Sequence, residues 1–189
     1  LDIPISIDTY KAEVAQQAVT AGAALINDVW GFQRDPDLAR VAADTGVPIV
    51  LMHNQSGTEY TELMTDVVAN MRKSVNSVRT AGVAEEAIIV DPGIGFGKTV
   101  QHNLELMRRL REFKDALSYP VLMGVSRKST IGTVLGGLPP DDRLEGTAAA
   151  VSMSIANGAD IVRVHDVKAM VRVSRMTDAI VRGWVPARS

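Results

Sequence analysis

The sequence predicts an α/β fold: a parallel (β/α) TIM barrel that is incomplete, with about six of its eight β/α units present. Short runs rich in Val and Ile alternate with longer segments of helical period. The apolar runs are nearly continuous, which is typical of strands covered on both faces. The chain has 189 residues, whereas a complete barrel usually needs about 250. We therefore expect one domain, residues 1–189, that lacks part of the barrel.

The predicted strands are the apolar runs themselves. We expect them at residues 3–7, 24–26, 48–52, 87–90, 120–123 and 160–164.

Helix boundaries between these strands are marked by residues with known positional preferences. Asp35 and Pro36 look like an N-cap followed by proline at the first helical position, and Gly46 stands where a left-handed C-terminal residue is favoured. Gly22, Gly82 and Gly158 occupy equivalent positions at other helix ends. A loop over residues 136–140 is expected to lead into a helix over residues 141–157.

One long helix is predicted over residues 103–117. Its apolar stripe consists of Leu104, Met107, Leu110 and Leu117. Its arginines, residues 108, 109 and 111, are expected to form a solvated outer face.

Composition excludes several classes of function. Net charge is -2, so no strong field favours nucleic acid or an anionic membrane. The chain has no cysteine and three histidines, which excludes thiol nucleophiles and thiolate metal sites. No apolar run approaches the roughly 20 residues of a membrane span. We expect a cytoplasmic protein that recognises its ligand locally.

Polar residues follow every predicted strand at its C-terminal end, where the loops of β/α barrels converge on one mouth. They are Asp8, Asn27, His53, Asp91, the run Ser126, Arg127 and Lys128, and the pair Arg163 and His165. Capping or loop hydrogen bonds explain any one of them alone. Six such coincidences on one rim predict a binding site.

The residue types indicate the chemistry of the ligand. Asp8 and Asp91 are expected to face Arg127, Lys128 and Arg163 across a partly dry mouth. Carboxylates that accept two hydrogen bonds suit a flat heterocycle with a guanidine-like edge, such as a pterin.

The rest of the rim suits the remainder of such a ligand. Asn27 can offer the ring a donor and an acceptor. We expect Arg163 and His165, two apart on one strand, to reach an anionic leaving group. The basic pair framed by hydroxyls at residues 126–129 can bind a carboxylate co-substrate or a phosphate.

The glycine-rich segment, residues 91–98, is not a nucleotide motif. A P-loop needs glycine where this chain has Pro92, and the G-x-G-x-G spacing differs from the dinucleotide fingerprint. We interpret the segment as a loop whose glycines let backbone approach a flat ligand, with Phe96 as an aromatic wall.

These motifs together resemble dihydropteroate synthase in order and spacing. The matching runs are residues 7–9, 26–29, 51–53, 91–98, 124–129 and 163–167. The resemblance implies a Mg²⁺-dependent transferase that joins 6-hydroxymethyl-7,8-dihydropterin diphosphate to 4-aminobenzoate, giving 7,8-dihydropteroate and diphosphate.

The resemblance also implies a role for each matching residue. Asp8, Asn27, Asp91 and Lys128 would hold the pterin beside Met52; Ser126 and Phe96 would contact the aminobenzoate; Arg163 would stack on the ring and, with His165, take the diphosphate. Lys128, Arg163 and His165 are thus the implied catalytic residues, and a homodimer through the last helices, including residues 148–155, is implied as well.

The chain departs from this family at its beginning. Family members start with a strand whose asparagine helps to place magnesium, and no residue here matches it, so we expect no metal ligand in this chain. We expect a fragment of a longer product, or a chain completed by a partner. Two alternatives stay open: a pterin-binding fragment without turnover, and the pterin-binding domain of a methyltetrahydrofolate:corrinoid methyltransferase.

Overall fold

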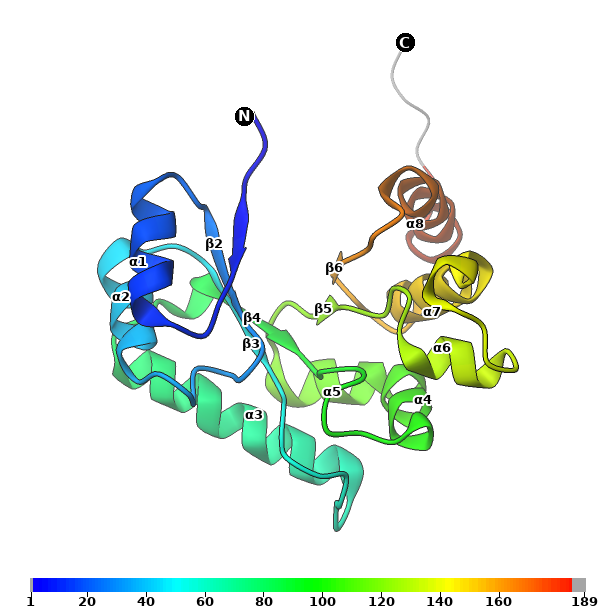
Figure 1. The fold of residues 1–189 in the computed structure, drawn as a ribbon, viewed down its shortest axis with the longest axis horizontal. Coiled ribbons are helices and arrows are strands. Elements are labelled where there is room, and N and C mark those ends of the chain that lie inside the picture. The colour runs from blue at the N-terminus through cyan, green and yellow to red at the C-terminus, as the bar shows by residue number, and fades with distance from the viewer. Residues whose placement is uncertain (1, 185–189) are drawn as a thin grey trace.

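A computed structural model describes residues 2–184 and shows parallel strands flanked by helices (Figure 1). The predicted domain, residues 1–189, thus includes six residues outside the described part. The strands are β1 (Ser6–Asp8), β2 (Leu25–Asp28), β3 (Ile49–Met52), β4 (Ile88–Asp91), β5 (Leu122–Met123) and β6 (Ile161–Val162). The helices are α1 (Ala12–Thr20), α2 (Asp37–Thr45), α3 (Leu63–Thr80), α4 (Val100–Arg108), α5 (Leu110–Leu117), α6 (Ser129–Val134), α7 (Leu144–Ala156) and α8 (Val167–Arg182), with 3-10 turns at Glu85–Ala87 and Pro140–Asp142.

The strands lie side by side in chain order, as in a β/α barrel. Strands β1 to β4 form one parallel sheet and β5 pairs with β6 in another. A parallel bridge between Val90 and Val121 joins the two sheets. Each predicted strand is present, although β6 ends at Val162, two residues earlier than expected. The predicted incomplete α/β barrel is confirmed.

The barrel is open between β1 and β6. A cavity of about 350 Å³ separates them, lined by residues of β1, β2, β5 and β6. Ile5 beside β1 is 47% exposed and Ile161 of β6 is 38% exposed, although side chains of this kind are buried in closed barrels. The edge strands β1 and β6 are therefore less buried than the strands between them.

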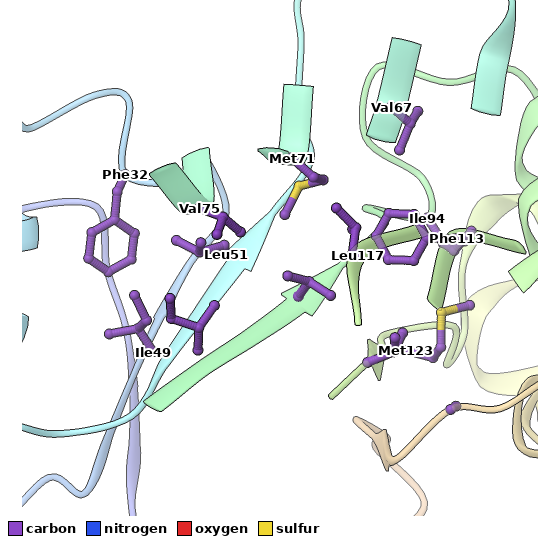
Figure 2. Packing of buried hydrophobic residues seen from close by; sticks show 14 of the residues in the cluster. Phe32, Ile49, Leu51, Val67, Met71, Val75, Ile94, Phe113, Leu117 and Met123 are labelled. Carbon is purple, nitrogen blue, oxygen red and sulfur yellow. The ribbon is translucent and has the colours of Figure 1, made fainter. Parts of the chain in front are cut away.

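The core lies between the strands and the long helix α3. Buried side chains recur along α3 every three or four residues, which places them on one face of the helix. Figure 2 shows Met71 and Val75 of this helix near Leu51 of β3, with Phe113 of α5 extending the same apolar layer. The layer fixes the strands whose ends carry the polar residues.

The helix expected over residues 103–117 is two helices. The chain breaks at Arg109, which has φ -97° and ψ 18° and whose guanidinium binds three glutamates. In α4, Leu106 is buried, whereas Leu104 is 40% exposed, so the prediction for Leu104 was wrong.

Other helix boundaries are nearer to expectation. Gly46 ends α2 in the left-handed conformation, as predicted. Helix α7 begins at Leu144 and not at residue 141, since Pro140–Asp142 forms a 3-10 turn. Among the helices within residues 2–184, none is both long enough and apolar enough to cross a membrane.

Candidate active site

Asp91 forms the centre of the site. It ends β4, is 6% exposed, and its Oδ1 accepts a hydrogen bond of 2.7 Å from the backbone N–H of Gly93. Burial raises the pKa of this carboxyl to about 6, while the Gly93 N–H and the nearby cations Lys128, Lys98 and Arg163 oppose the rise. A buried carboxylate with free acceptor capacity is suited to a ligand that brings its own donors.

Lys128 and Phe96 lie together beside Asp91. The Lys128 ammonium is 4.2 Å from the centre of the Phe96 ring, a favourable cation–π contact. Burial lowers the pKa of Lys128 and Asp91 opposes the shift. A Cβ on Gly95 would come within 3.1 Å of the Lys128 side chain, so a larger residue here would crowd the lysine.

Asn27, Asp8 and Arg163 form a chain of polar contacts on the other side. Asp8 and Asn27 are paired across β1 and β2, and the Asn27 amide donates to Asp8 Oδ2 at 3.1 Å. Arg163, which follows β6, binds the same oxygen at 3.2 Å across the opening of the barrel. Asn27 is buried, but Asp8 and Arg163 are exposed.

Met52 lies at the floor of the site. It ends β3 opposite Asp91 in the strand register and is 5% exposed. Met52 therefore lies beside the buried carboxylate, and its contact with a pterin stays a prediction.

Ser126 and His165 contact each other at the ends of β5 and β6. The Ser126 Oγ lies 3.0 Å from His165 Nδ1 and accepts a hydrogen bond of 3.2 Å from the His165 backbone N–H. Because β6 ends at Val162, Arg163 and His165 belong to the following loop and not to a strand, contrary to the prediction. Arg163 contacts Asp8 while His165 contacts Ser126, so the two side chains have different partners.

Arg127 does not face Asp8 or Asp91, and that part of the prediction was wrong. Its guanidinium makes two hydrogen bonds to Asp166, of 3.1 and 2.8 Å, and also binds Asp141. Its backbone has φ 57°, a left-handed conformation that is rare for a side chain of this size. Two hydrogen bonds hold that conformation: the Arg143 guanidinium donates to the Arg127 carbonyl oxygen, and the Arg127 N–H donates to Thr147 Oγ1. Arg127 thus braces the loop that carries Ser126 and Lys128.

His53 was expected at the rim of the site, but its pairing with Lys98 was not predicted. The Lys98 ammonium lies 2.9 Å from His53 Nδ1 and 2.9 Å from the Phe96 carbonyl oxygen. The position of Lys98 at the end of the glycine-rich segment was the one sequence feature that could have marked it as a site residue. Asn103 was also missed: its Oδ1 accepts from the Gly95 N–H at 2.8 Å and fixes the same loop.

Within residues 2–184 there is no group of three or more His, Asp or Glu side chains that could hold an ion. The carboxylates at the mouth are instead engaged with an amide, an arginine and a backbone N–H.

The strand ends thus bring a buried carboxylate, an amide, two cations and an aromatic ring to one edge of an α/β barrel. Such a set of groups forms a binding site for a flat polar heterocycle. Residues 1–165 match the family described as "Pterin binding enzyme". The chain belongs to this pterin-binding enzyme family.

Its similarity to individual proteins is high along most of its length. It is 54% identical to a dihydropteroate synthase of Clostridium beijerinckii, covering 96% of this chain and 67% of the relative. It is 53% identical to a Bacillus subtilis dihydropteroate synthase, covering 95% and 62%. A dihydropteroate synthase structure from Clostridium difficile, solved in the presence of pteroic acid, superposes with a TM-score of 0.93 at 49% identity, covering 96% and 69%. The chain thus spans about two thirds of the length of these relatives.

Proposed function

We propose that the chain carries the larger part of the active site of a dihydropteroate synthase. This enzyme condenses 6-hydroxymethyl-7,8-dihydropterin diphosphate with 4-aminobenzoate. The observation that carries the proposal is the buried Asp91 carboxylate, which has acceptor capacity left and lies opposite Lys128. A pterin offers adjacent N–H donors on its guanidine-like edge, and two hydrogen bonds to one carboxylate satisfy both groups. Asn27, also buried, supplies a donor and an acceptor at the end of β2, on the far side of β3 from Asp91.

The proposed reaction replaces one bond to the pterin methylene by another. The C–O bond to diphosphate breaks, a C–N bond to the aminobenzoate amine forms, and the amine loses one proton. Cationic character that develops on the methylene is stabilised by the carboxylates, and Arg163 and His165 stabilise the departing diphosphate. Ser126 and Phe96 are assigned to the aminobenzoate. Arg127 acts on this site through Asp166 and the loop it braces.

An assay of diphosphate release tests the proposal. The chain is incubated with the pterin diphosphate and 4-aminobenzoate, and pterin binding is measured in parallel. Release that requires both substrates supports the transferase. Pterin binding without release identifies this chain as a pterin-binding module, and absence of binding overturns the proposal.

Magnesium and the cytoplasmic location stay predictions.

A homodimer is the proposed assembly, and the surface of α7 and α8 supports it. Met153, Met176 and Ile180 are 55%, 63% and 72% exposed along a groove between these helices, and exposed apolar patches of this kind mark interaction sites. Met176→Glu combined with Ile180→Glu is expected to halve the mass in solution towards the 20.3 kDa of one chain. Sedimentation measures this, and Val14→Glu on the exposed face of α1 serves as control. A wild-type chain that sediments as a monomer contradicts the proposal.

A further inference from the structure

Lys98 joins two segments that reach the site from different strands. Its ammonium lies 2.9 Å from Nδ1 of His53, the residue after β3, and donates to the Phe96 carbonyl oxygen at 2.9 Å. The backbone N–H of His53 in turn donates to the Asp91 carbonyl oxygen at 2.9 Å. Lys98 therefore closes a ring of contacts from β3, through β4, to the glycine-rich loop.

The protonation states fix the direction of the contact with His53. The imidazole is 1% exposed, and burial, together with the charge of Lys98, lowers its pKa to about 3. A neutral imidazole can accept at Nδ1, so the lysine is the donor. Burial also lowers the pKa of Lys98 to about 7, and Asp91 is the neighbour that favours its charged form.

The loop leaves little freedom around this ammonium. A Cβ on Gly93 would overlap the His53 carbonyl oxygen and would lie 3.3 Å from Lys98 Nζ. Within residues 2–184 Lys98 makes no ion pair at salt-bridge distance, while its two polar partners are neutral. The charge also acts on the Asp91 carboxylate, whose Oδ1 is bound by the N–H of Gly93, the glycine that lies next to the ammonium.

We propose that Lys98 is a positioning residue of the site: held by His53 and by the Phe96 carbonyl, it fixes the glycine-rich loop and keeps the Asp91 carboxylate ionised for the pterin. The inference rests on the proposed function. It assigns to Lys98 an effect that is exerted through Asp91, without contact between the lysine and the ligand.

The test compares Lys98→Met, Lys98→Arg and the wild type, with Lys73→Met on the exposed face of α3 as the matched control. Affinity for 6-hydroxymethylpterin is measured by fluorescence between pH 5 and 9, and thermal unfolding is recorded for each variant. The charged groups that face Asp91 are Lys98 from the loop, Lys128 from the end of β5 and Arg163 from the loop after β6.

Without the charge of Lys98, Asp91 should take up its proton at higher pH. We expect the pH at which half of the pterin affinity is lost to rise by about one unit in Lys98→Met. Affinity at pH 6 should then fall by about fivefold and recover above pH 8. Lys98→Arg should restore the wild-type midpoint, because it returns a charge that does not titrate in this range.

An equal loss of affinity at every pH, with no recovery in Lys98→Arg, shows a merely structural contact and overturns the inference. An unchanged midpoint in a Lys98→Met chain that still unfolds cooperatively overturns it too. In both cases a wild-type chain that binds pterin leaves the proposed function standing. A wild-type chain without pterin binding at any pH removes the proposed function and this inference together.

Discussion

Asp91 and Asp8 both stand at the C-terminal ends of parallel strands, but only Asp91 is buried. Asp91 is 6% exposed and lies between β3 and β5, whereas the side chain of Asp8 is 49% exposed at the open edge of β1. We refer to Asn27, Met52, His53 and Asp91 as the buried floor, and to Asp8, Arg163 and His165 as the open rim. The strands of the floor have neighbouring strands on both sides, whereas Asp8 and Arg163 of the rim contact each other across the opening of the barrel. Binding strength should therefore come from the floor.

The largest expected effect is that of Asp91→Asn on pterin affinity. Asparagine keeps an acceptor for the Gly93 N–H but loses the charge and one of the two acceptors for the guanidine-like edge. Hydrogen bonds to charged groups contribute about 1.5–3 kcal/mol each, so we expect a loss of about 100-fold, measured by fluorescence titration. Asp160→Asn at the opposite end of the barrel, where Asp160 binds Lys114, is the control. Retained affinity in Asp91→Asn would show that the floor does not hold the ligand.

The same carboxyl should lower the stability of the empty chain at neutral pH. Its pKa rises from 3.8 to about 6 on folding, so between these values the folded state binds more protons than the unfolded state. The stability of the wild type should then fall as pH rises from about 4 to about 6, relative to Asp91→Asn, by up to about 3 kcal/mol. Urea unfolding of both proteins at several pH values measures the difference. A difference that does not vary with pH would contradict the raised pKa.

Lys128→Ala should have a smaller effect than Asp91→Asn. The lysine lies on the Phe96 ring and helps to keep Asp91 ionised. Its removal is expected to weaken pterin binding by about tenfold, which corresponds to about 1.4 kcal/mol, with little change in unfolding free energy because a partly buried charge is removed as well. Titration calorimetry and urea unfolding separate the two quantities. Unchanged affinity would place Lys128 outside the site.

The floor is also the part of the site that could be predicted more fully. Asn27, Met52 and Asp91 follow continuous apolar runs, and parallel strands bring such ends to one edge irrespective of sequence distance. The partners of Arg127 and Lys98 could not be predicted in this way. Arg127 takes a left-handed turn that depends on Arg143 and Thr147, and Lys98 reaches a histidine 45 positions away. Those contacts depend on how loops pack, for which local sequence carries no periodic signal.

The same limit applies to the fold. Helix ends at Gly46 and Gly158 were predictable because a left-handed residue has a strong preference for glycine. The break at Arg109 was not, since it accompanies ion pairs with Glu62, Glu105 and Glu112, of which Glu62 is distant in sequence.

The smallest expected effect is that of Arg163→Ala on stability. This variant tests most directly whether the rim is less firmly held than the floor. The Arg163–Asp8 pair spans the opening of the barrel, but its side chains are 61% and 49% exposed. Exposed ion pairs contribute about 0–1 kcal/mol and are screened by salt. We therefore expect the unfolding free energy to change by less than about 1 kcal/mol, and the difference from wild type to shrink further in high salt. Urea unfolding at low and high salt measures this, with Arg40→Ala, in the exposed pair with Asp37 on α2, as the matched control. A loss that is much larger and independent of salt would mean that the pair holds the two edges together, and the rim would then be as firmly built as the floor.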